Sequence, residues 1–204
     1  MCCISSEEME PLVYLVEIKN SIDEHTFNFL LRYAEPYKKG NIKSHPQKDE
    51  ADRMLVGDIL LKCVLKAEFS IPMSKLNIQL GELGKPYLPE FPHIHFNISH
   101  SGNYVVCAIA EAPVGIDIQT IMTYKQRIAK RVLSPGNVKE IEDSRNPDLL
   151  FTKYWAEKEA LLKMVGCGFS GDVKEEELEF NRKTVVTDQY VISIAYQNKN
   201  RSQG

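Results

Sequence analysis

The pattern of hydrophobic and polar positions along the chain predicts a mixture of strands and helices. Short runs rich in β-branched and aromatic residues are typical of strands. Such runs occupy residues 11–18, 76–80, 93–98, 104–110, 114–119, 178–180, 184–186 and 190–195. Apolar residues that recur every three or four positions indicate helices, and these span residues 21–33, 49–69, 124–132 and 147–165. The polar, basic stretch 35–45 is expected to be a loop because it carries proline and glycine.

Residues at the ends of the predicted helices mark where they begin and stop. Ser21 and Glu24 form a capping box at the start of the first helix. Ser134 and Asn146 each precede a proline, and an N-cap residue followed by proline at the first helical position is a start signal. Gly166 follows the last helix at a position where glycine commonly ends one. The prolines therefore predict one short helix after Ser134 and one long helix after Asn146.

The order of these elements indicates an α+β fold, with antiparallel strands and interspersed helices. The 204 residues are enough for one domain or for two small ones packed together. With 43% hydrophobic and 26% charged residues, the composition is that of an ordinary globular protein with ample material for a core.

Charge and hydropathy argue against several functional classes. The net charge of −3 gives no basic surface of the kind that binds nucleic acid. The chain has no apolar run long enough to span a bilayer, and the acidic residues 1–8 lack the apolar core of a signal peptide. We therefore expect a cytoplasmic protein that binds neither nucleic acid nor membrane. The five cysteines have no zinc-site spacing, and Cys63 and Cys107 lie in apolar stretches, so we expect both to be reduced core residues.

Two short acidic clusters in the second half of the chain carry the candidate chemistry. Asp117 and Gln119 lie two positions apart on one predicted strand and therefore point to the same face. Glu159, on the last long helix, adds a second carboxylate. Such oxygen atoms suit Mg²⁺, which binds one or two carboxylates together with waters and substrate phosphates. The alternative is that Asp117 merely ends a strand and that Glu159 pairs with Lys163 on a solvated face.

Several cations are candidate ligands for phosphate. Lys158 and Lys163 lie on the same predicted helix as the second carboxylate, and lysine binds phosphate as a point charge. Lys85 lies in a stiff Gly-Lys-Pro turn, and His100 lies at the tip of a predicted strand connection. Each of these side chains could equally be an ordinary surface residue. The sequence contains neither a nucleotide-binding glycine loop nor the serine elbow of α/β-hydrolases.

Four sequence motifs follow one another at characteristic separations. They are Gly-Lys-Pro at residues 84–86, Phe-Asn-Ile-Ser-His-Ser-Gly at 96–102, Val-Gly-Ile-Asp at 114–117, and the acidic helix at 155–163 with Gly166 and Gly168. In this order they resemble the surfactin-synthetase-type 4′-phosphopantetheinyl transferases. Residues 48–53 also resemble the start of the family's helix at which a basic residue meets coenzyme A. The similarity covers about residues 38–168. Any single motif is unspecific, whereas the ordered set is a strong signal.

The resemblance implies an activity and a more detailed fold. The family transfers the phosphopantetheine arm of coenzyme A to a serine of an acyl or peptidyl carrier protein and releases 3′,5′-ADP. Its fold consists of two similar α+β halves related by a pseudo-twofold axis, with coenzyme A and Mg²⁺ in the cleft between them. In this chain the halves are expected to span residues 1–102 and 103–204, and a monomer would suffice. The pathway implied is nonribosomal peptide or polyketide biosynthesis.

The resemblance also assigns roles to individual residues. Asp117, Glu159 and Gln119 would hold the metal, and Lys163 and Lys158 would lie along the pyrophosphate. The implied ligands of coenzyme A are Lys85, Pro86, Ser99, His100, Arg53, Lys38 and Lys43, the last three at the 3′-phosphate. The implied catalytic set consists of Glu159, Lys163 and Asp117, with Glu159 as the candidate base for the proton of the carrier serine.

Position 119 departs from the family pattern. Many relatives carry an acidic residue where this chain has Gln119. An amide oxygen can bind a metal, but it brings no charge. We therefore expect weaker metal binding, or a water in this place. The departure affects the expected metal preference more than the expected activity.

The sequence leaves several alternatives open. The same chemistry could serve a fatty-acid carrier instead of a peptide or polyketide synthase. A binding protein that holds coenzyme A or the carrier without catalysis has only Gln119 in its favour. A Mg²⁺-dependent nucleotide hydrolase would need a water-activating residue that the sequence does not reveal.

The expected docking region for the carrier is residues 124–141, which combines apolar and cationic side chains. Carrier helices are acidic as a class, so cations here would attract them. The alternative is that these cations only form the solvent-exposed face of a helix. The residues concerned are Ile128, Val132 and Leu133 and the cations Lys125, Arg127, Lys130 and Arg131.

Overall fold

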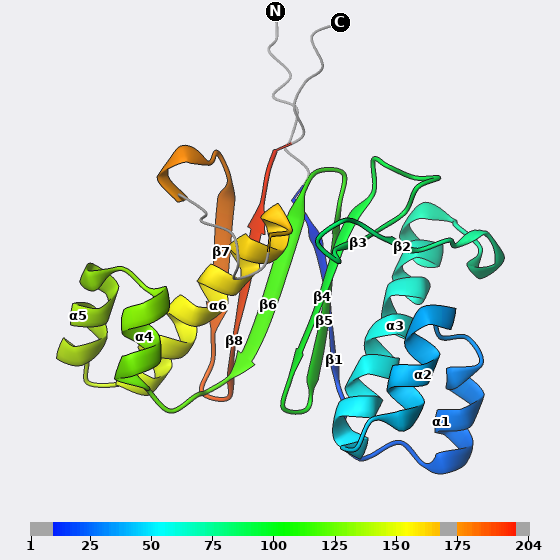
Figure 1. Cartoon of the computed structure of the whole chain (residues 1–204), viewed down its shortest axis with the longest axis horizontal. Coiled ribbons are helices and arrows are strands. Elements are labelled where there is room, and N and C mark those ends of the chain that lie inside the picture. The colour runs from blue at the N-terminus through cyan, green and yellow to red at the C-terminus, as the bar shows by residue number, and fades with distance from the viewer. Residues whose placement is uncertain (1–9, 168–174, 199–204) are drawn as a thin grey trace, which may run out of the picture.

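Two sheets meet in the middle of the molecule, and helices cover both outer sides (Figure 1). The computed structural model describes residues 10–167 and 175–198, so Gly168 lies outside the described residues. Both sheets are antiparallel. Among the helices described, none combines the length and the apolar character that crossing a membrane would require. The α+β class expected from the sequence is confirmed.

The N-terminal half consists of β1 (Leu12–Glu17), α1 (Glu24–Leu31), α2 (Pro36–Ser44), α3 (Lys48–Phe69), η1 (Met73–Lys75), β2 (Gln79–Leu80), β3 (Pro86–Tyr87), β4 (His95–Ser101) and β5 (Tyr104–Ala110). Its three-stranded sheet has the order β1-β5-β4, and β2 and β3 form a separate short hairpin. The long helix α3 packs against β4 and β5, and α1 and α2 pack against α3.

The C-terminal half consists of β6 (Val114–Thr120), α4 (Gln126–Val132), α5 (Pro135–Asp143), α6 (Pro147–Val165), η3 (Glu175–Glu177), β7 (Asn181–Val186) and β8 (Tyr190–Tyr196). Its sheet has the order β6-β8-β7. The long helix α6 packs against β6 and β8, and α5 packs against α6.

The two halves share one order of connections. In each half a first strand is followed by helices, the last of them long, and then by a hairpin whose final strand pairs with the first strand. The two sheets therefore correspond strand by strand, as a pseudo-twofold axis requires. Because β5 pairs with both β1 and β4, the expected boundary after residue 102 falls inside a hairpin. The sheets divide between Ala110 and Val114 instead.

Most of the expected helix ends are found, with one shift. Ser134 and Asn146 cap α5 and α6 through hydrogen bonds from backbone N–H groups, as the sequence predicts. The first helix begins after Asp23, which accepts a hydrogen bond from Thr26 N, and not after Ser21. A carboxylate and a hydroxyl both serve as N-caps, so the sequence alone did not distinguish these two starts.

The stretch expected to be a loop forms helix α2, because buried charges on α3 hold it in place. Asp58 of α3 is 1% exposed and accepts hydrogen bonds from Glu35 N and Lys38 Nζ, each at 2.9 Å. Lys62, one turn further on, pairs with the Glu35 carboxylate at 2.7 Å. Buried charges are tolerated when they are paired in this way. The partners lie on another helix, so the local sequence pattern of α2 does not reveal them.

We expect Asp58→Asn to reduce the free energy of unfolding by about 2 kcal/mol, because hydrogen bonds to a buried charged group are worth more than neutral ones. Urea denaturation measures the change. The matched control is Lys66→Ala on an exposed part of the same helix, which should change stability by less than about 0.5 kcal/mol. Equal stabilities of Asp58→Asn and the control would contradict the role of this ion network.

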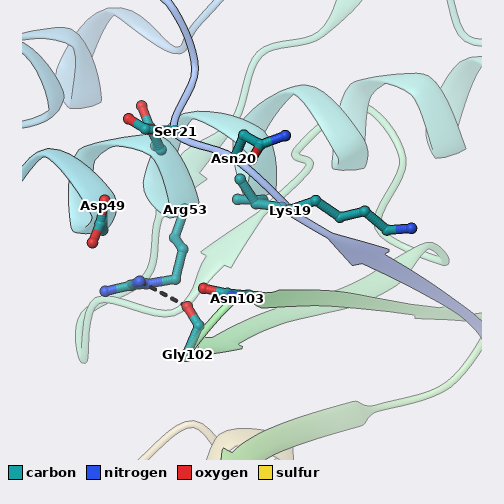
Figure 2. A pocket seen from close by; sticks show the side chains of 9 residues that line it. Lys19, Asn20, Ser21, Asp49, Arg53, Gly102 and Asn103 are labelled. Atoms are coloured by element: carbon teal, nitrogen blue, oxygen red, sulfur yellow. Dashed lines mark hydrogen bonds between the residues drawn. The ribbon is translucent and has the colours of Figure 1, made fainter.

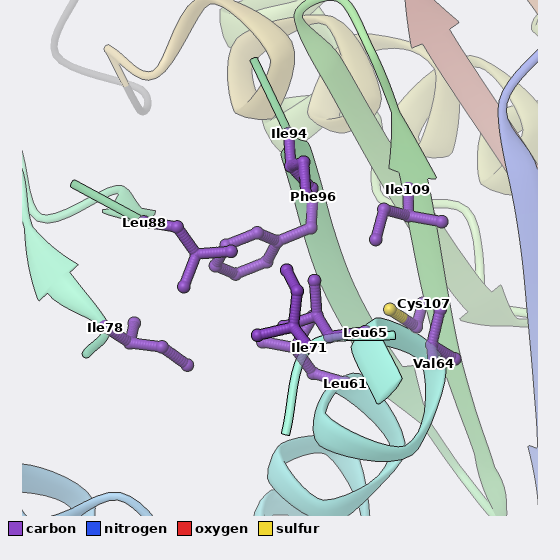
Figure 3. Packing of buried hydrophobic residues seen from close by; sticks show 10 residues of the cluster. All are labelled: Leu61, Val64, Leu65, Ile71, Ile78, Leu88, Ile94, Phe96, Cys107 and Ile109. Carbon is purple, nitrogen blue, oxygen red and sulfur yellow. The ribbon is translucent and has the colours of Figure 1, made fainter. Parts of the chain in front are cut away.

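The core of the N-terminal half lies between α3 and its sheet, as Figure 3 shows. Leu61 and Leu65 of α3 form one cluster with Phe96 of β4 and Cys107 of β5. Cys107 is fully buried as expected, and burial raises the pKa of its thiol to about 12. Cys63 was expected in the core but is exposed. It lies two positions after Leu61, which turns it to the opposite side of the helix.

Candidate active site

An ion pair of the C-terminal half, Asp117 with Lys163, contacts Ser99 of the N-terminal half where β4, β6 and α6 meet. Asp117 of β6 is 1% exposed, and its Oδ1 accepts hydrogen bonds from Lys163 Nζ of α6 at 2.6 Å and from Ser99 Oγ of β4 at 2.7 Å. Lys163 Nζ also donates to Ser99 Oγ at 3.0 Å. The structure therefore brings together three residues that the sequence placed in one site.

Gly115 allows α6 to approach β6 closely enough for this ion pair to form. A Cβ atom at Gly115 would lie 2.1 Å from the carbonyl oxygen of Ala160 and 2.2 Å from Met164 N, both in the backbone of α6. Only glycine fits at such a close approach of backbone to backbone. Gly115 and Asp117 share one face of the strand, so the same contact aims the Asp117 carboxylate at α6.

Glu159 precedes Lys163 by about one turn of α6 and therefore lies on the same side of the helix. Its pKa is raised above the ordinary value of a glutamate. Burial is the main cause, Lys163 opposes the shift, and the negative charge of Asp117 adds to it. A carboxylate whose pKa is raised toward neutrality is a more effective proton acceptor than an ordinary one. The arrangement thus supplies a candidate base beside a candidate phosphate ligand.

Gln119 donates a hydrogen bond to Asp117 through its amide nitrogen. Its Nε2 lies 2.9 Å from Asp117 Oδ2. An ionised carboxylate only accepts hydrogen bonds, so the amide nitrogen must face it and the amide oxygen must face elsewhere. That oxygen lies 3.5 Å from Ser101 Oγ. In this structure Gln119 holds Asp117 in place, and its expected role as a metal ligand stays a prediction.

Arg53 and His100 both lie beside Glu50. Arg53 pairs with Glu50 on α3 and donates to the carbonyl oxygen of Gly102 at 2.7 Å (Figure 2). His100 Nδ1 lies 3.6 Å from Glu50 Oε1. Burial lowers the pKa of His100 against the opposing effect of Glu50, so the ring stays neutral at pH 7. Arg53 also lines the polar hollow of about 220 Å³ seen in Figure 2.

Lys85 reaches from the N-terminal half to the end of α6. Its Nζ donates to the carbonyl oxygens of Met164 at 2.7 Å and of Val114 at 3.4 Å. Burial lowers the pKa of its ammonium group to about 8. Lys85 and Pro86 together line a hollow of about 280 Å³. Lys85 thus ties the two halves together here, and the expected contacts of Lys85 and Pro86 with the nucleotide stay predictions.

Comparison with known proteins identifies the family. A family model described as "4′-phosphopantetheinyl transferase, N-terminal" matches residues 21–112, and one described as "4′-phosphopantetheinyl transferase superfamily" matches residues 113–200. The chain is 30% identical over 160 residues to the 4′-phosphopantetheinyl transferase Sfp of Bacillus subtilis (strain 168), a match that covers 78% of this chain and 71% of that protein. This chain belongs to the 4′-phosphopantetheinyl transferase family.

Other relatives of this transferase agree with the assignment. The 4′-phosphopantetheinyl transferase gsp of Aneurinibacillus migulanus is 34% identical over 155 residues, which cover 75% of this chain and 65% of that protein. The L-aminoadipate-semialdehyde dehydrogenase-phosphopantetheinyl transferase of Mus musculus is 26% identical over 169 residues, which cover 74% of this chain and 53% of that protein. The resemblance to surfactin-type transferases is confirmed. The two family models also meet where the two sheets divide.

Asp117 and Glu159 are the carboxylates that would hold the expected magnesium ion, and this role stays a prediction. Asp117 and Glu159 are close enough for the charge of Asp117 to raise the pKa of Glu159, and both interact with the single cation Lys163. A divalent ion between the two carboxylates would relieve their repulsion. Residues 10–167 and 175–198 contain no group of three or more His, Cys, Asp or Glu side chains placed to hold a metal. Waters and substrate phosphates would therefore supply the remaining ligands, as Mg²⁺ commonly accepts.

Three of the expected coenzyme A ligands have other surroundings than the Asp117–Lys163 ion pair. Lys38 of α2 pairs with Asp58 at 2.9 Å. Lys43 is exposed on the last turn of α2. Lys158 lines a separate hollow beside Arg182 of β7. The roles expected for these lysines at the phosphates of coenzyme A stay predictions.

Sequence reasoning missed two residues that shape the site. Glu50 holds Arg53 and His100, and its position three residues before Arg53 on a predicted helix is a signal for such a pair. Asn97 accepts a hydrogen bond from Ile116 N across the junction of the halves. Asn97, Ser99 and Ser101 lie at every second position of the strand and therefore on one face, and this pattern could have indicated the role of Asn97.

Proposed function

We propose that this transferase moves the 4′-phosphopantetheine group of coenzyme A to a serine of an apo acyl or peptidyl carrier protein, with Mg²⁺ as cofactor, and releases 3′,5′-ADP. The observation that carries the proposal is the pair of buried Asp117 with half-buried Lys163, with Glu159 one turn away, at the junction of the two halves. Family membership supports the same reaction.

Glu159 is the group that takes the proton of the carrier serine. A serine hydroxyl is a weak nucleophile at neutral pH and needs an adjacent base. Glu159 lies one turn from Lys163 on the same side of α6, beside the proposed phosphate ligand. Asp117 is less suited, because its two oxygens already accept hydrogen bonds from Ser99, Lys163 and Gln119.

Lys163 stabilises the pyrophosphate of coenzyme A. An ammonium group has three N–H donors. Among the described residues, Asp117 and Ser99 use two of them, and the third would meet a phosphate oxygen. There it offsets the negative charge that develops on the departing 3′,5′-ADP. Asp117 and Glu159 would hold Mg²⁺, which when bound acts as a Lewis acid toward the same oxygens.

Arg53 and His100 would meet the phosphates of the nucleotide. The guanidinium group of Arg53 lies at the turn after β4, next to the strand that carries Ser99 and His100. Its Nε and Nη2 donate to Glu50 and its Nη1 donates to the Gly102 carbonyl oxygen, so among the described residues one N–H of each Nη stays available for a phosphate.

The carrier docks on α4, whose exposed cations attract an acidic partner. Lys125, Arg127, Lys130 and Arg131 are all exposed. Helix α4 contributes Ala129 to a core cluster that also contains Phe151 of α6, the helix that carries Glu159. A carrier bound to α4 would therefore contact the C-terminal half, which also contains the proposed base Glu159.

Reversing the charge of Lys130 and Arg131 to glutamate should raise the KM for the carrier about 10-fold and spare the affinity for coenzyme A. Initial rates at varied carrier concentration measure the first effect, and calorimetry measures the second. The control reverses Lys66 and Lys75, two exposed lysines of the N-terminal half. An equal rise of the KM for the carrier in both double variants would contradict docking on α4, because it would show that the net charge of the protein decides the effect.

The release of 3′,5′-ADP, measured with and without apo carrier, separates the proposed reaction from its alternatives. A transferase releases 3′,5′-ADP only when apo carrier is present. A nucleotide hydrolase releases it from coenzyme A alone, and a binding protein releases none in either case. Side-by-side rates with peptidyl, polyketide and fatty-acid carriers then identify the preferred class.

We also propose that the transferase works as a monomer in the cytoplasm. Both halves of the site come from one chain, since Asp117 and Lys163 belong to the second half and Ser99 to the first. Cys63 and Cys107 are free thiols, which suits a reducing compartment.

A further inference from the structure

The seam between the two halves is the line along which β4 lies beside β6. Side chains of β4 form the hydrogen bonds across it, in place of the backbone hydrogen bonds of a sheet. Strand β6 pairs with β8 along one edge. Along the other edge of β6, the backbone N–H groups of three residues donate to side-chain oxygens of β4. The donors are every second residue of β6, and the acceptors are every second residue of β4. The three hydrogen bonds run from Ile116 N to Asn97 Oδ1 at 2.9 Å, from Ile118 N to Ser99 Oγ at 3.3 Å, and from Thr120 N to Ser101 Oγ at 3.0 Å.

This side-chain ladder, formed by Asn97, Ser99 and Ser101, satisfies the open edge of β6. Alternate residues of a strand point to one face, so the three acceptors stand in a row with the spacing of the β6 donors. An unpaired backbone N–H group in a buried position is costly. The ladder therefore fixes how far β6 can slide along β4, and with it the position of Asp117 relative to the N-terminal half.

Ser99, the middle rung, is the member that also touches the ion pair. A hydroxyl group has one donor and two acceptor positions. Ser99 Oγ donates to Asp117 Oδ1 at 2.7 Å and accepts from Lys163 Nζ at 3.0 Å and from Ile118 N at 3.3 Å. All three positions are used, and the residue is 6% exposed. The single hydroxyl proton of Ser99 is donated to Asp117, so the hydroxyl group has no further proton to donate to a phosphate oxygen.

We propose that Ser99 is a positioning residue for phosphopantetheine transfer and not a ligand of the nucleotide phosphates. It sets the separation of Asp117 and Lys163 and anchors both to the seam, so that the third N–H group of Lys163 points toward the phosphates. This inference rests on the proposed transferase function. Displacement of a reacting or binding group by about 1 Å can cost about 100-fold in rate, so the loss of this anchor should appear in kcat.

The test is Ser99→Ala, with Ser99→Cys as a second variant of nearly the same size. We expect kcat to fall about 10-fold or more in both, while the KM for coenzyme A and its calorimetric Kd change less than about 2-fold. The thiol is a weak hydrogen-bonding group, so it preserves packing without restoring the anchor. Ser99→Thr, which keeps the hydroxyl, should recover much of the wild-type kcat.

The matched control is Asn97→Ala, which removes a rung of the same ladder at the opposite end from Ser101. It should lower the melting temperature about as much as Ser99→Ala and keep kcat well above that of Ser99→Ala. A rise in KM and Kd for coenzyme A with unchanged kcat in the Ser99 variants would overturn the proposal, because that pattern marks a nucleotide ligand. Equal loss of kcat in Asn97→Ala would overturn it too.

The wild-type chain in the same assay separates this inference from the proposed function. If the wild type transfers no phosphopantetheine, the proposed function fails, whatever the Ser99 variants do. In that case calorimetry still decides the role of Ser99, since loss of coenzyme A binding in Ser99→Ala would make it a ligand. If the wild type transfers, the split between kcat and KM decides.

Discussion

Replacement of Glu159 by glutamine is expected to reduce kcat for phosphopantetheine transfer about 100-fold or more. The amide has nearly the size and shape of the carboxylate, but it cannot take the proton of the carrier serine. Glu159 and Lys163 lie one turn apart on the same side of α6, so the proposed base lies beside the proposed phosphate ligand. Initial rates at saturating coenzyme A and carrier measure the loss.

The matched control is Glu157→Gln, which makes the same chemical change two residues away on α6. Glu157 accepts a hydrogen bond from Thr184 at 2.9 Å and pairs with Arg182 at 3.6 Å, so it faces β7 and not Asp117. Its kcat should stay close to the wild-type value. Near-wild-type turnover of Glu159→Gln would rule out Glu159 as the base.

The largest effect on stability is expected for Gly115→Ala, which should lower the free energy of unfolding by about 4 kcal/mol or more. The added methyl group would overlap backbone atoms of Ala160 and Met164, at 2.1 and 2.2 Å. Backbone atoms of a packed helix cannot rotate away as a flexible side chain would. Helix α6 must therefore move off β6, which also pulls Lys163 from Asp117. Urea denaturation measures the change.

Gly40→Ala is the control for this prediction. A Cβ atom at Gly40 of α2 has no heavy atom of another residue within 4 Å, neighbours and its own helix aside. Alanine favours a helix over glycine by about 1 kcal/mol, so this variant should be slightly more stable than the wild type. If both glycine variants have wild-type stability, the close packing of α6 on β6 is not what holds the two elements together.

Elements whose signals lie within one segment were predictable from the sequence. The long helices α3 and α6 follow from apolar periodicity, and the N-cap Asn146 and the left-handed Gly166 mark the ends of α6. The convergence of Asp117, Glu159 and Lys163 was predictable only from the resemblance of the ordered motifs to the family, because periodicity fixes the face on which a residue lies and not which elements meet. The structure brings these three residues to one place.

Features set by distant partners were not predictable from local patterns. Helix α2 depends on Asp58, which lies on another helix. Residues 178–180 were expected to form a strand but form none, and strand β7, Asn181–Val186, begins three residues before the expected strand at 184–186. It lies at the edge of its sheet, where polar residues such as Arg182 and Lys183 face solvent and weaken the hydrophobic pattern.

The hydrogen-bond partners of polar side chains were the least predictable feature of the site. Motif position placed Lys85, Gln119 and Ser99 near the nucleotide or the metal. In the structure Lys85 donates to carbonyl oxygens at the end of α6, Gln119 donates to Asp117, and the Ser99 hydroxyl is fully used within the seam. Which partner a side chain takes depends on groups that only the tertiary fold brings within reach.

The measurement that tests the transferase function most directly is intact-mass spectrometry of an apo carrier protein incubated with this chain, coenzyme A and Mg²⁺. The carrier should gain the mass of one phosphopantetheine, and the gain should vanish with EDTA or when alanine replaces the acceptor serine of the carrier. No gain on any of several peptidyl and acyl carriers, while coenzyme A still binds, would contradict the transferase function.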